Sequence, residues 1–159
     1  MIPHAYLAGC VEPHEDRLKE LFLAMYEEMA RMGLRITLAA GGEETWLANL
    51  ASTLERFSAL TLATVDEDVV GFAVGVLRFT PDYLGAEKLG AITHVYVCPH
   101  VRRDGTGRRL VELLHTWFAE KKVRSCELQV LCGNREAIVF WERLGYGAEL
   151  LQMRKGIEV

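Results

Sequence analysis

The sequence predicts one mixed α/β domain, with a central mixed sheet flanked by helices. The 159 residues are half hydrophobic and one quarter charged, which is globular composition and enough chain for one substantial core. Stretches of helical period are interspersed with β-branched stretches, as one sheet covered by helices requires. No repeat, low-complexity tract or long linker divides the chain.

Two helices are expected in the first third, after a possible short strand at residues 6–11. The first is expected over residues 15–32, with Gly33 as its stop. The second is expected over residues 44–57. Their apolar faces are formed by Leu18, Leu21, Phe22, Met25 and Met29 in the first, and by Trp46, Leu47, Leu50, Leu54 and Phe57 in the second.

Three strands follow. The segments "ALTLATV" (59–65) and "VVGFAVGVLRF" (69–79) are rich in β-branched residues, and residues 66–68 between them are typical of a hairpin turn. The third strand, "AITHVYV" (91–97), is expected to end before Pro99, which has no N–H to donate.

The last third is expected to hold two helices and two strands. A helix runs to about residue 122 and buries Leu110 and Trp117 among others, and "SCELQVL" (125–131) is a strand. A short helix then begins after Asn134 as N-cap and ends before Gly145. A final strand is expected over residues 147–155.

Composition excludes several function classes. A formal charge of −4 argues against general nucleic-acid binding. No apolar run approaches the roughly 18 residues of a membrane span, and the first residues show no signal-peptide pattern. The four cysteines lack CxxC or zinc-finger spacing, which favours free thiols in a reducing cytoplasm. The histidines outside the third strand have no ligand-like spacing, so no metal is expected.

A basic loop, "RRDGTGRR" (102–109), joins the third strand to the following helix. The first turn of a helix has free N–H groups and a partial positive charge, and glycines allow close approach, so the loop suits a phosphate or diphosphate. A P-loop lysine is missing, and Leu110 stands where a dinucleotide fingerprint needs glycine. The pattern R-x-x-G-x-G is met by Arg102, Gly105 and Gly107, after V-x-P at Val97 and Pro99.

This segment resembles the acyl-CoA-binding motif of the GNAT superfamily of N-acyltransferases. A second stretch, "NREAIVFWERLGYG", resembles the family's N-x-x-A-x-x-x-Y-x-x-x-G-[FY] through Asn134, Ala137, Gly145 and Tyr146. The resemblance implies a single GNAT domain over residues 1–159, with a mostly antiparallel sheet splayed in the middle. The alternative is a tight strand–helix turn with a solvated basic face.

The resemblance implies acetyl-CoA as acyl donor. The backbone of Tyr96 and Val97 would pair with the pantetheine arm, and the loop amides would hold the diphosphate. Asn134 would reach the pantetheine from the other side of the splayed strands. The implied cofactor-binding set is Tyr96, Val97, Arg102, Arg103, Asp104, Gly105, Thr106, Gly107, Arg108, Asn134, Ala137 and Trp141.

The family's chemistry is direct attack of a primary amine on the thioester, and the candidate catalytic residues are His94, Tyr96 and Trp141. His94 shares a strand face with Tyr96 and Cys98 and could accept the amine's proton, or could simply pack there. Many members carry a tyrosine acid where this chain has Trp141, whose indole cannot give up a proton.

Two explanations of that departure stay open: the thiolate leaves with only hydrogen-bond or solvent help, or Tyr146 or Tyr83 supplies the proton. A covalent acyl-cysteine at Cys98 or Cys132 is disfavoured, because no activating base lies close.

The amine acceptor is expected over the first two helices and the connection between the second and third strands. The first helix is acidic, at Glu15, Asp16, Glu20, Glu27 and Glu28. Asp16, Glu20 and Glu27 fall opposite its apolar face, which favours a solvated stripe over a substrate site. Residues 43, 44, 82 and 83 (Glu43, Glu44, Asp82 and Tyr83) are better placed to line an acceptor cleft.

Other functional outcomes stay open. A degenerate acyl-CoA-binding module with regulatory work is the main alternative to the enzyme, and a nucleotide-handling protein is a third class. The expected partners are acetyl-CoA and a small or peptidic amine, with no nucleic acid and no membrane, and a homodimer is possible.

Overall fold

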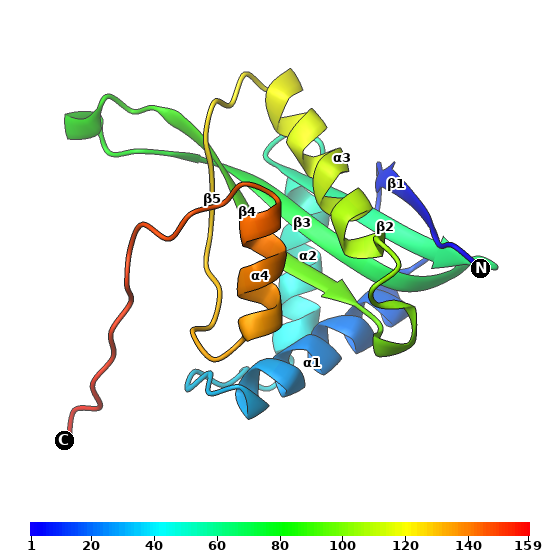
Figure 1. Ribbon diagram of the computed structural model, residues 1–159, viewed down its shortest axis with the longest axis horizontal. Helices are drawn as coiled ribbons and strands as arrows, with labels where there is room; N and C mark the ends of the chain where they lie inside the picture. Colours follow the sequence, from blue (N-terminus) through cyan, green and yellow to red (C-terminus); the bar gives the residue numbers. More distant parts are fainter.

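The computed structural model describes residues 1–159 and contains five strands and four α-helices. Two short 3₁₀ turns, Asp82–Leu84 and Pro99–Val101, lie in the connections. In chain order the elements are β1 (His4–Ala8), α1 (Glu15–Arg31), α2 (Gly42–Thr53), β2 (Ser58–Val65), β3 (Asp68–Phe79), β4 (Lys88–Val97), α3 (Thr106–Glu120), β5 (Cys126–Leu128) and α4 (Arg135–Arg143) (Figure 1).

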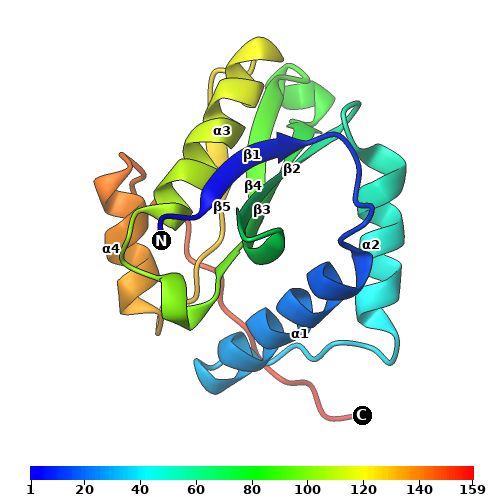
Figure 2. The same cartoon turned by 90° about the vertical axis from the view of Figure 1, so that its right-hand side faces the viewer.

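The strands form one open sheet in the order β1-β2-β3-β4-β5. The first four pair antiparallel, and β5 alone pairs parallel to β4. This is the mixed, mostly antiparallel sheet that the sequence and the family resemblance predicted. The helices α1 and α2 lie on one face of the sheet, and α3 and α4 lie on the other (Figure 2).

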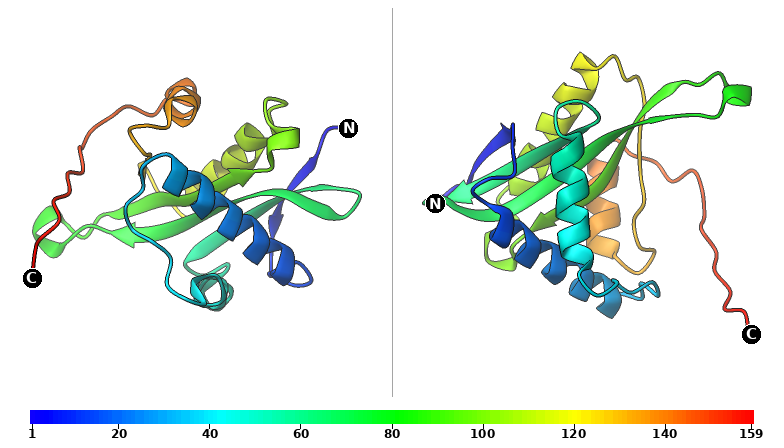
Figure 3. Two further views of the ribbon diagram at one scale, coloured as in Figure 1. Left: turned by 90° about the horizontal axis from the view of Figure 1, so that it is seen from below. Right: turned by 180° about the vertical axis from the view of Figure 1, so that it is seen from behind.

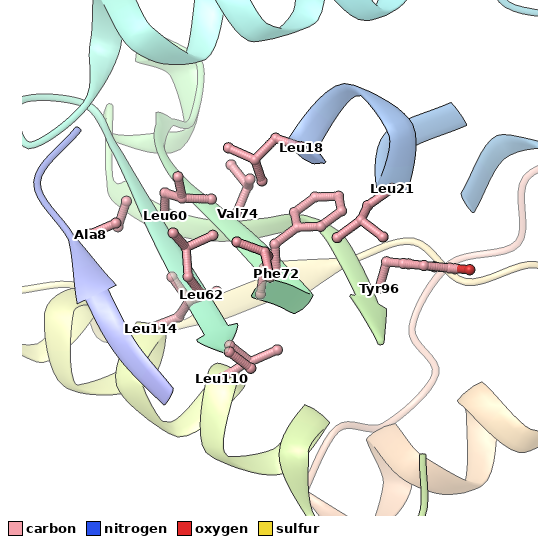
Figure 4. Packing of buried hydrophobic residues seen from close by; sticks show 14 of the residues in the cluster. Ala8, Leu18, Leu21, Leu60, Leu62, Phe72, Val74, Tyr96, Leu110 and Leu114 are labelled. Carbon is pink, nitrogen blue, oxygen red and sulfur yellow. The ribbon is translucent and has the colours of Figure 1, made fainter. Parts of the chain in front are cut away.

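The core forms because both faces of the central strands are covered. The first six residues of β2 are all buried, which explains why this stretch has small or apolar residues on both faces, with only Ser58 and Thr61 polar, and no charged side chain. Figure 4 shows Leu60, Leu62 and Phe72 of β2 and β3 between Leu18 of α1 and Leu110 of α3. None of these five side chains is exposed. No helix combines the length and apolar character that a membrane crossing needs.

The Phe118 ring of α3 packs so closely against the sheet that the two strand positions beneath it must be glycine. A Cβ at Gly75 would lie 2.8 Å from Cζ of Phe118, and a Cβ at Gly90 would lie 2.9 Å from the same ring. Real carbon atoms do not approach so closely, so both strand positions need glycine because α3 sits so near. This contact fixes the start of β4 beneath α3.

Most predicted elements are confirmed, with shifted ends. The hairpin turn between β2 and β3 is confirmed, with positive φ at Asp66 and Glu67 as a tight hairpin favours. Helix α2 ends at Thr53, four residues early, since Glu55 adopts a φ of 69° that stops a helix. Phe57, predicted to face inward, is therefore 47 % exposed.

Two predictions for the last third are wrong. The strand predicted over 125–131 covers only Cys126–Leu128, because β4 offers pairing to no more than these residues. The strand predicted over 147–155 does not form: residues 147–159 are exposed and pair with no strand of the sheet. Figure 1 shows them as an extended segment after α4. An isolated extended segment has no ladder in which to pair.

Candidate functional site

A bulge in β4 opens the sheet at its centre. His94 lies opposite Val74 and Ile92 lies opposite Gly75, so Thr93 is an extra residue on the β4 side. The parallel pairing with β5 ends at Ile92. Residues 94–97 therefore have a strand partner on one side only. Their backbone groups on the other side are available to a ligand, except the Val97 carbonyl, which accepts from Arg102 Nε.

The loop between β4 and α3 is shaped by positive φ and by an aspartate. Arg103 has a φ of 67°, and Gly105, the residue that precedes α3, has a φ of 85°. The Asp104 carboxylate accepts hydrogen bonds from the N–H of Thr106, at 2.9 Å, and from its hydroxyl. Burial opposes ionisation of Asp104, but these hydrogen bonds outweigh it and lower its pKa below the usual value.

The loop leaves a row of backbone N–H groups free at the start of α3. No acceptor within the protein bonds the amides of Arg103, Asp104, Gly105, Gly107 or Arg108. These donors surround a helix N-terminus, which carries partial positive charge. An arrangement of this kind can accept an anion.

The arginine side chains of this loop are already engaged within the protein. Arg102 donates from Nε to the Val97 carbonyl at 2.7 Å, and its Nη2 lies 3.0 Å from each carboxylate oxygen of Glu28. Arg109 donates to the Asp104 carbonyl and to the Thr106 hydroxyl, while its Nε is buried without a partner. These two guanidinium groups hold the loop in place.

Two other arginines are paired less firmly. Arg103 lies 3.1 Å from Glu136 of α4, and Arg108 lies 2.7 Å from Glu112 within α3. All four side chains are more than half exposed, and such surface pairs contribute little. Either arginine can exchange its carboxylate for a phosphate at small cost.

Beyond its bulge, strand β4 directs its even-numbered side chains toward α1, so His94, Tyr96 and Cys98 share a face as predicted. The His94 ring lies 5.7 Å from that of Phe22 and 5.5 Å from that of Trp46. The Tyr96 hydroxyl lies 3.4 Å from Glu28 and points away from the other labelled core side chains (Figure 4).

His94 is a neutral imidazole in this setting. Burial lowers its pKa to about 4, well below the near-neutral titration expected from its residue type. Its Nδ1 lies 2.8 Å from the Thr93 hydroxyl, which holds the ring in one orientation. The imidazole can accept a proton at neutral pH, but it does not titrate there.

The neighbouring Tyr96 and Cys98 are kept uncharged. Burial, together with Glu28 beside it, raises the pKa of Tyr96. Burial likewise raises the pKa of the Cys98 thiol, against the opposing charge of Arg17. A protonated thiol is a poor nucleophile, so the geometry gives no support to an acyl-cysteine at this position.

Helix α4 places the residues of the second motif. The Asn134 side-chain oxygen accepts from the Ala137 N–H at 3.1 Å, which confirms Asn134 as N-cap and leaves its amide group free to donate. Trp141 is 8 % exposed and lies between Phe140 and Tyr146, with ring centroids 4.9 and 5.2 Å away. Its indole N–H donates to no protein acceptor.

The two tyrosines proposed as substitute acids are poorly suited to that role. The Tyr146 hydroxyl lies 2.6 Å from His115 Nε2, and burial raises its pKa far above the usual value. Tyr83 is 85 % exposed at the tip of the β3–β4 hairpin, which projects beyond the sheet (Figure 1). Of the two explanations for Trp141, unassisted or hydrogen-bonded thiolate departure is the one the geometry favours.

Residues expected to line the acceptor cleft are only partly brought together. Asp82 and Tyr83 lie on the hairpin tip, apart from His94. Glu44 of α2 accepts a hydrogen bond from Lys19 of α1 at 2.9 Å. The acidic stripe of α1 at positions 16, 20 and 27 is exposed, as predicted.

Glu28 was missed in the sequence because it was grouped with those exposed acids. It belongs to the inward face of α1, seven residues after Leu21 and three after Met25. Its side chain is only 20 % exposed and joins α1 to both Tyr96 and Arg102. The helical spacing contained this signal. No group of three or more metal-ligating side chains lies together in the structure.

Comparison with known proteins adds an independent observation. The sequence profile of the Acetyltransferase (GNAT) family matches residues 15–146. No protein with a curated description matches the chain in sequence. Several solved structures share the fold over nearly their whole length.

Three of these structures are the following. A tetramutant of the BH1408 protein from Bacillus halodurans is 18% identical, with 97% of this chain and 99% of that chain covered and a TM-score of 0.80. A transcriptional regulator from Bacillus halodurans C-125 is 16% identical, with 97% and 100% covered and a TM-score of 0.76. The aminoglycoside acetyltransferase meta-AAC0020 from an uncultured soil metagenomic sample, in complex with trehalose, is 15% identical, with 99% and 97% covered and a TM-score of 0.72. At such identities the likeness is one of fold.

Proposed function

Because this chain belongs to the GNAT family of acetyltransferases, we propose that it transfers an acetyl group from acetyl-CoA to a primary amine, both substrates being bound together. The observation that carries the proposal is the row of free amides at the start of α3, directly after the opened edge of β4. Free amides at a helix start are what binds a diphosphate, and an open strand edge is what pairs with an extended amide-containing arm.

The donor is expected to lie along the α3 and α4 side of β4. Val97 faces this side, since a Cβ at Gly107 would lie 3.8 Å from Val97 Cγ2 and 3.5 Å from the Phe140 ring. The free amides of the loop would hold the diphosphate. Of the predicted pair Tyr96 and Val97, only Val97 directs its backbone away from β3, because the Cys98 N–H donates to the Val70 carbonyl, and the Val97 N–H would pair with the pantetheine. Asn134 would donate from its free amide group.

In the reaction, the amine nitrogen attacks the thioester carbonyl carbon, and the C–S bond then breaks to release CoA thiolate. His94, neutral and on the opposite face of β4, is proposed to accept the amine's proton, directly or through water. A backbone N–H near Val97 would stabilise the oxyanion. The thiolate takes its proton from solvent, since a thiol pKa near 8.5 makes it a tolerable leaving group.

The acceptor is proposed to approach from the α1 and α2 side. His94, Phe22 and Trp46 lie together there, and the Glu28 carboxylate is offset by Arg102. This lining is aromatic around one imidazole, which suits an amine carried on an apolar or ring-containing body.

Turnover with a panel of primary amines tests the proposal. Purified protein is incubated with acetyl-CoA and each amine, and both free CoA and acetylated amine are quantified by mass spectrometry, because the four cysteines would react with thiol reagents. We expect equimolar CoA and acetylamine for at least one amine, and loss of both in His94→Gln. Hydrolysis without acetylamine, or no reaction across the panel, would contradict an amine acetyltransferase.

A second function is favoured by one specific observation, the tryptophan at position 141. A buried indole without a proton to give suits a module that binds acyl-CoA and reports on it. The fold similarity to a transcriptional regulator is compatible with such a role. Tight acetyl-CoA binding with no turnover for any amine would favour this module over the enzyme.

A further inference from the structure

An ion pair joins the proposed acceptor side of the molecule to the basic loop of the donor side. Glu28 lies in the second half of α1, and the right-hand view of Figure 3 shows α1 and α2 in front of the sheet, with α3 and α4 behind it. Arg102 follows β4 and begins the R-x-x-G-x-G pattern. Its Nη2 lies 3.0 Å from each carboxylate oxygen of Glu28, so the loop is tied to a helix on the other face of the sheet.

This pair is more enclosed than the other ion pairs of the molecule. The Glu28 and Arg102 side chains are 20 % and 35 % exposed, whereas every other pair has at least one partner that is more than half exposed. The Tyr96 hydroxyl also donates to Glu28, at 3.4 Å, and the Arg102 guanidinium lies over the Tyr96 ring, 5.4 Å from its centroid. Three mutually connected groups hold one geometry more firmly than a solvated surface pair does.

Arg102 extends this constraint to the peptide group that follows Val97. Its Nε donates to the Val97 carbonyl at 2.7 Å, and the N–H of the same peptide group, that of Cys98, donates to the Val70 carbonyl of β3 at 2.8 Å. A peptide group held at both polar ends cannot turn without breaking a hydrogen bond. The end of β4 is therefore fixed at Val97, whose N–H is the backbone group expected to pair with the acyl donor.

We propose that Glu28 is a positioning residue for the acyl-donor site: it holds Arg102, and Arg102 fixes the end of β4 so that the Val97 N–H is directed at the donor. Glu28 itself would touch neither the donor nor the reacting atoms. The inference rests on the proposed function for the identity of the donor.

The alternative role for Glu28 is to bind the cationic form of an amine substrate, since it lies on the acceptor side. The geometry disfavours this role, because both carboxylate oxygens already accept hydrogen bonds from Arg102 and one also accepts from Tyr96. The two roles also differ in their kinetics. Loss of an amine anchor raises the KM of the amine, whereas loss of a positioning residue for the donor weakens acetyl-CoA binding.

Glu28→Gln, which keeps the size of the side chain and removes its charge, separates these roles. Acetyl-CoA is an anion, so removing a nearby negative charge would by Coulomb's law alone strengthen its binding. We expect the opposite in calorimetric titration, a loss of about 5- to 10-fold in acetyl-CoA affinity. The KM of the amine at saturating acetyl-CoA should change by less than about 2-fold. The control Glu27→Gln removes the same charge from the exposed neighbouring position and should bind acetyl-CoA as the wild type does.

A double-mutant cycle tests whether the effect passes through Arg102. Arg102→Met keeps an unbranched stem beside Tyr96 and donates to neither Glu28 nor the Val97 carbonyl. In that background Glu28→Gln should weaken acetyl-CoA binding by less than about 2-fold, because the connection is already broken. Equal losses in both backgrounds, tighter binding by Glu28→Gln, or a raised amine KM would overturn the proposal.

Amide hydrogen exchange measured by NMR on the ligand-free protein gives a readout that needs no donor. The Cys98 N–H should exchange at least about 10-fold faster in Glu28→Gln than in the wild type. The Leu77 N–H, which donates to the Phe57 carbonyl, should exchange as before and shows that the sheet is intact. Unchanged exchange at Cys98 would overturn the proposal. A wild type that binds no acetyl-CoA would instead remove the proposed function, and exchange at Cys98 would still decide whether Glu28 holds the end of β4.

Discussion

At the scale of single residues, the site works through groups that are kept uncharged or already paired. His94 is neutral because burial against Phe22 and Trp46 penalises the imidazolium. Arg102 is hydrogen-bonded to Glu28 and to the Val97 carbonyl, so its guanidinium group stabilises the loop and is not free to bind a phosphate. Anion binding is therefore expected to come chiefly from backbone amides, which remain after any substitution except one to proline.

His94 gives the first prediction at this scale. Its pKa is about 4 in the folded protein and near 6.5 when unfolded, so the unfolded state binds the proton more readily between these values. The contribution of neutral His94 to the free energy of unfolding is then fully present above pH 6.5. It is lost as pH falls toward 4, and the loss is about 3 kcal/mol at most. In urea unfolding between pH 7 and pH 4, the His94→Gln variant should not show this loss of stability.

In the turnover assay the same substitution should lower kcat about 10-fold or more at every pH from 6 to 9, without changing the shape of the profile. Any rise over that range would then belong to the amine substrate. The exposed His100 supplies the control His100→Gln, expected to match wild type. Equal kcat values for His94→Gln and wild type would remove His94 from the mechanism.

At the scale of elements, the two faces of β4 carry the two proposed substrates, the amine on one face and the acyl donor on the other. From His94 on, the even-numbered residues of β4 face α1 and its odd-numbered residues face α3 and α4. Before the bulge at Thr93 the alternation is reversed, since Gly90 faces α3, and the pairing with β5 ends at Ile92. The position of α3 over β4 matters for the same reason, since the free amides belong to its first turn. Phe118 sets that position by lying against Gly75 and Gly90.

The packing of α3 gives the prediction for this scale. Gly75→Ala should destabilise the protein by about 1–3 kcal/mol in urea unfolding, because the buried Phe118 ring is held from two sides and cannot yield. Gly147→Ala, where a new Cβ meets nothing within 4 Å, should fall within about 0.5 kcal/mol of wild type. Adding Phe118→Leu to Gly75→Ala should recover part of the loss, and a fully stable Gly75→Ala would contradict this packing.

The elements also show what the sequence could and could not predict. Local rules found the β2–β3 turn, the Asn134 cap and the loop before α3, because each depends on neighbouring residues only. The length of β5 and the state of residues 147–159 depend on which strands lie beside them, and local pattern does not contain that. The lowered pKa of His94 likewise depends on packing by α1 and α2.

At the scale of the whole molecule, α1 and α2 cover one face of the sheet and α3 and α4 the other (Figure 2). In the proposed function these are the acceptor side and the donor side, and they would meet beyond Ile92, where the pairing of β4 with β5 ends. The account as a whole depends on one claim, that the free amides at the start of α3 bind the diphosphate of CoA.

Calorimetric titration with acetyl-CoA tests this claim most directly. We expect one saturable site per chain in the wild type and binding at least about 10-fold weaker in Gly107→Leu, whose side chain would fill the space beside Phe140 and Val97. Gly156→Leu, in open surroundings, should bind as the wild type does. A wild type that gives no heat at millimolar acetyl-CoA, or a Gly107→Leu variant that binds unchanged, would contradict the account.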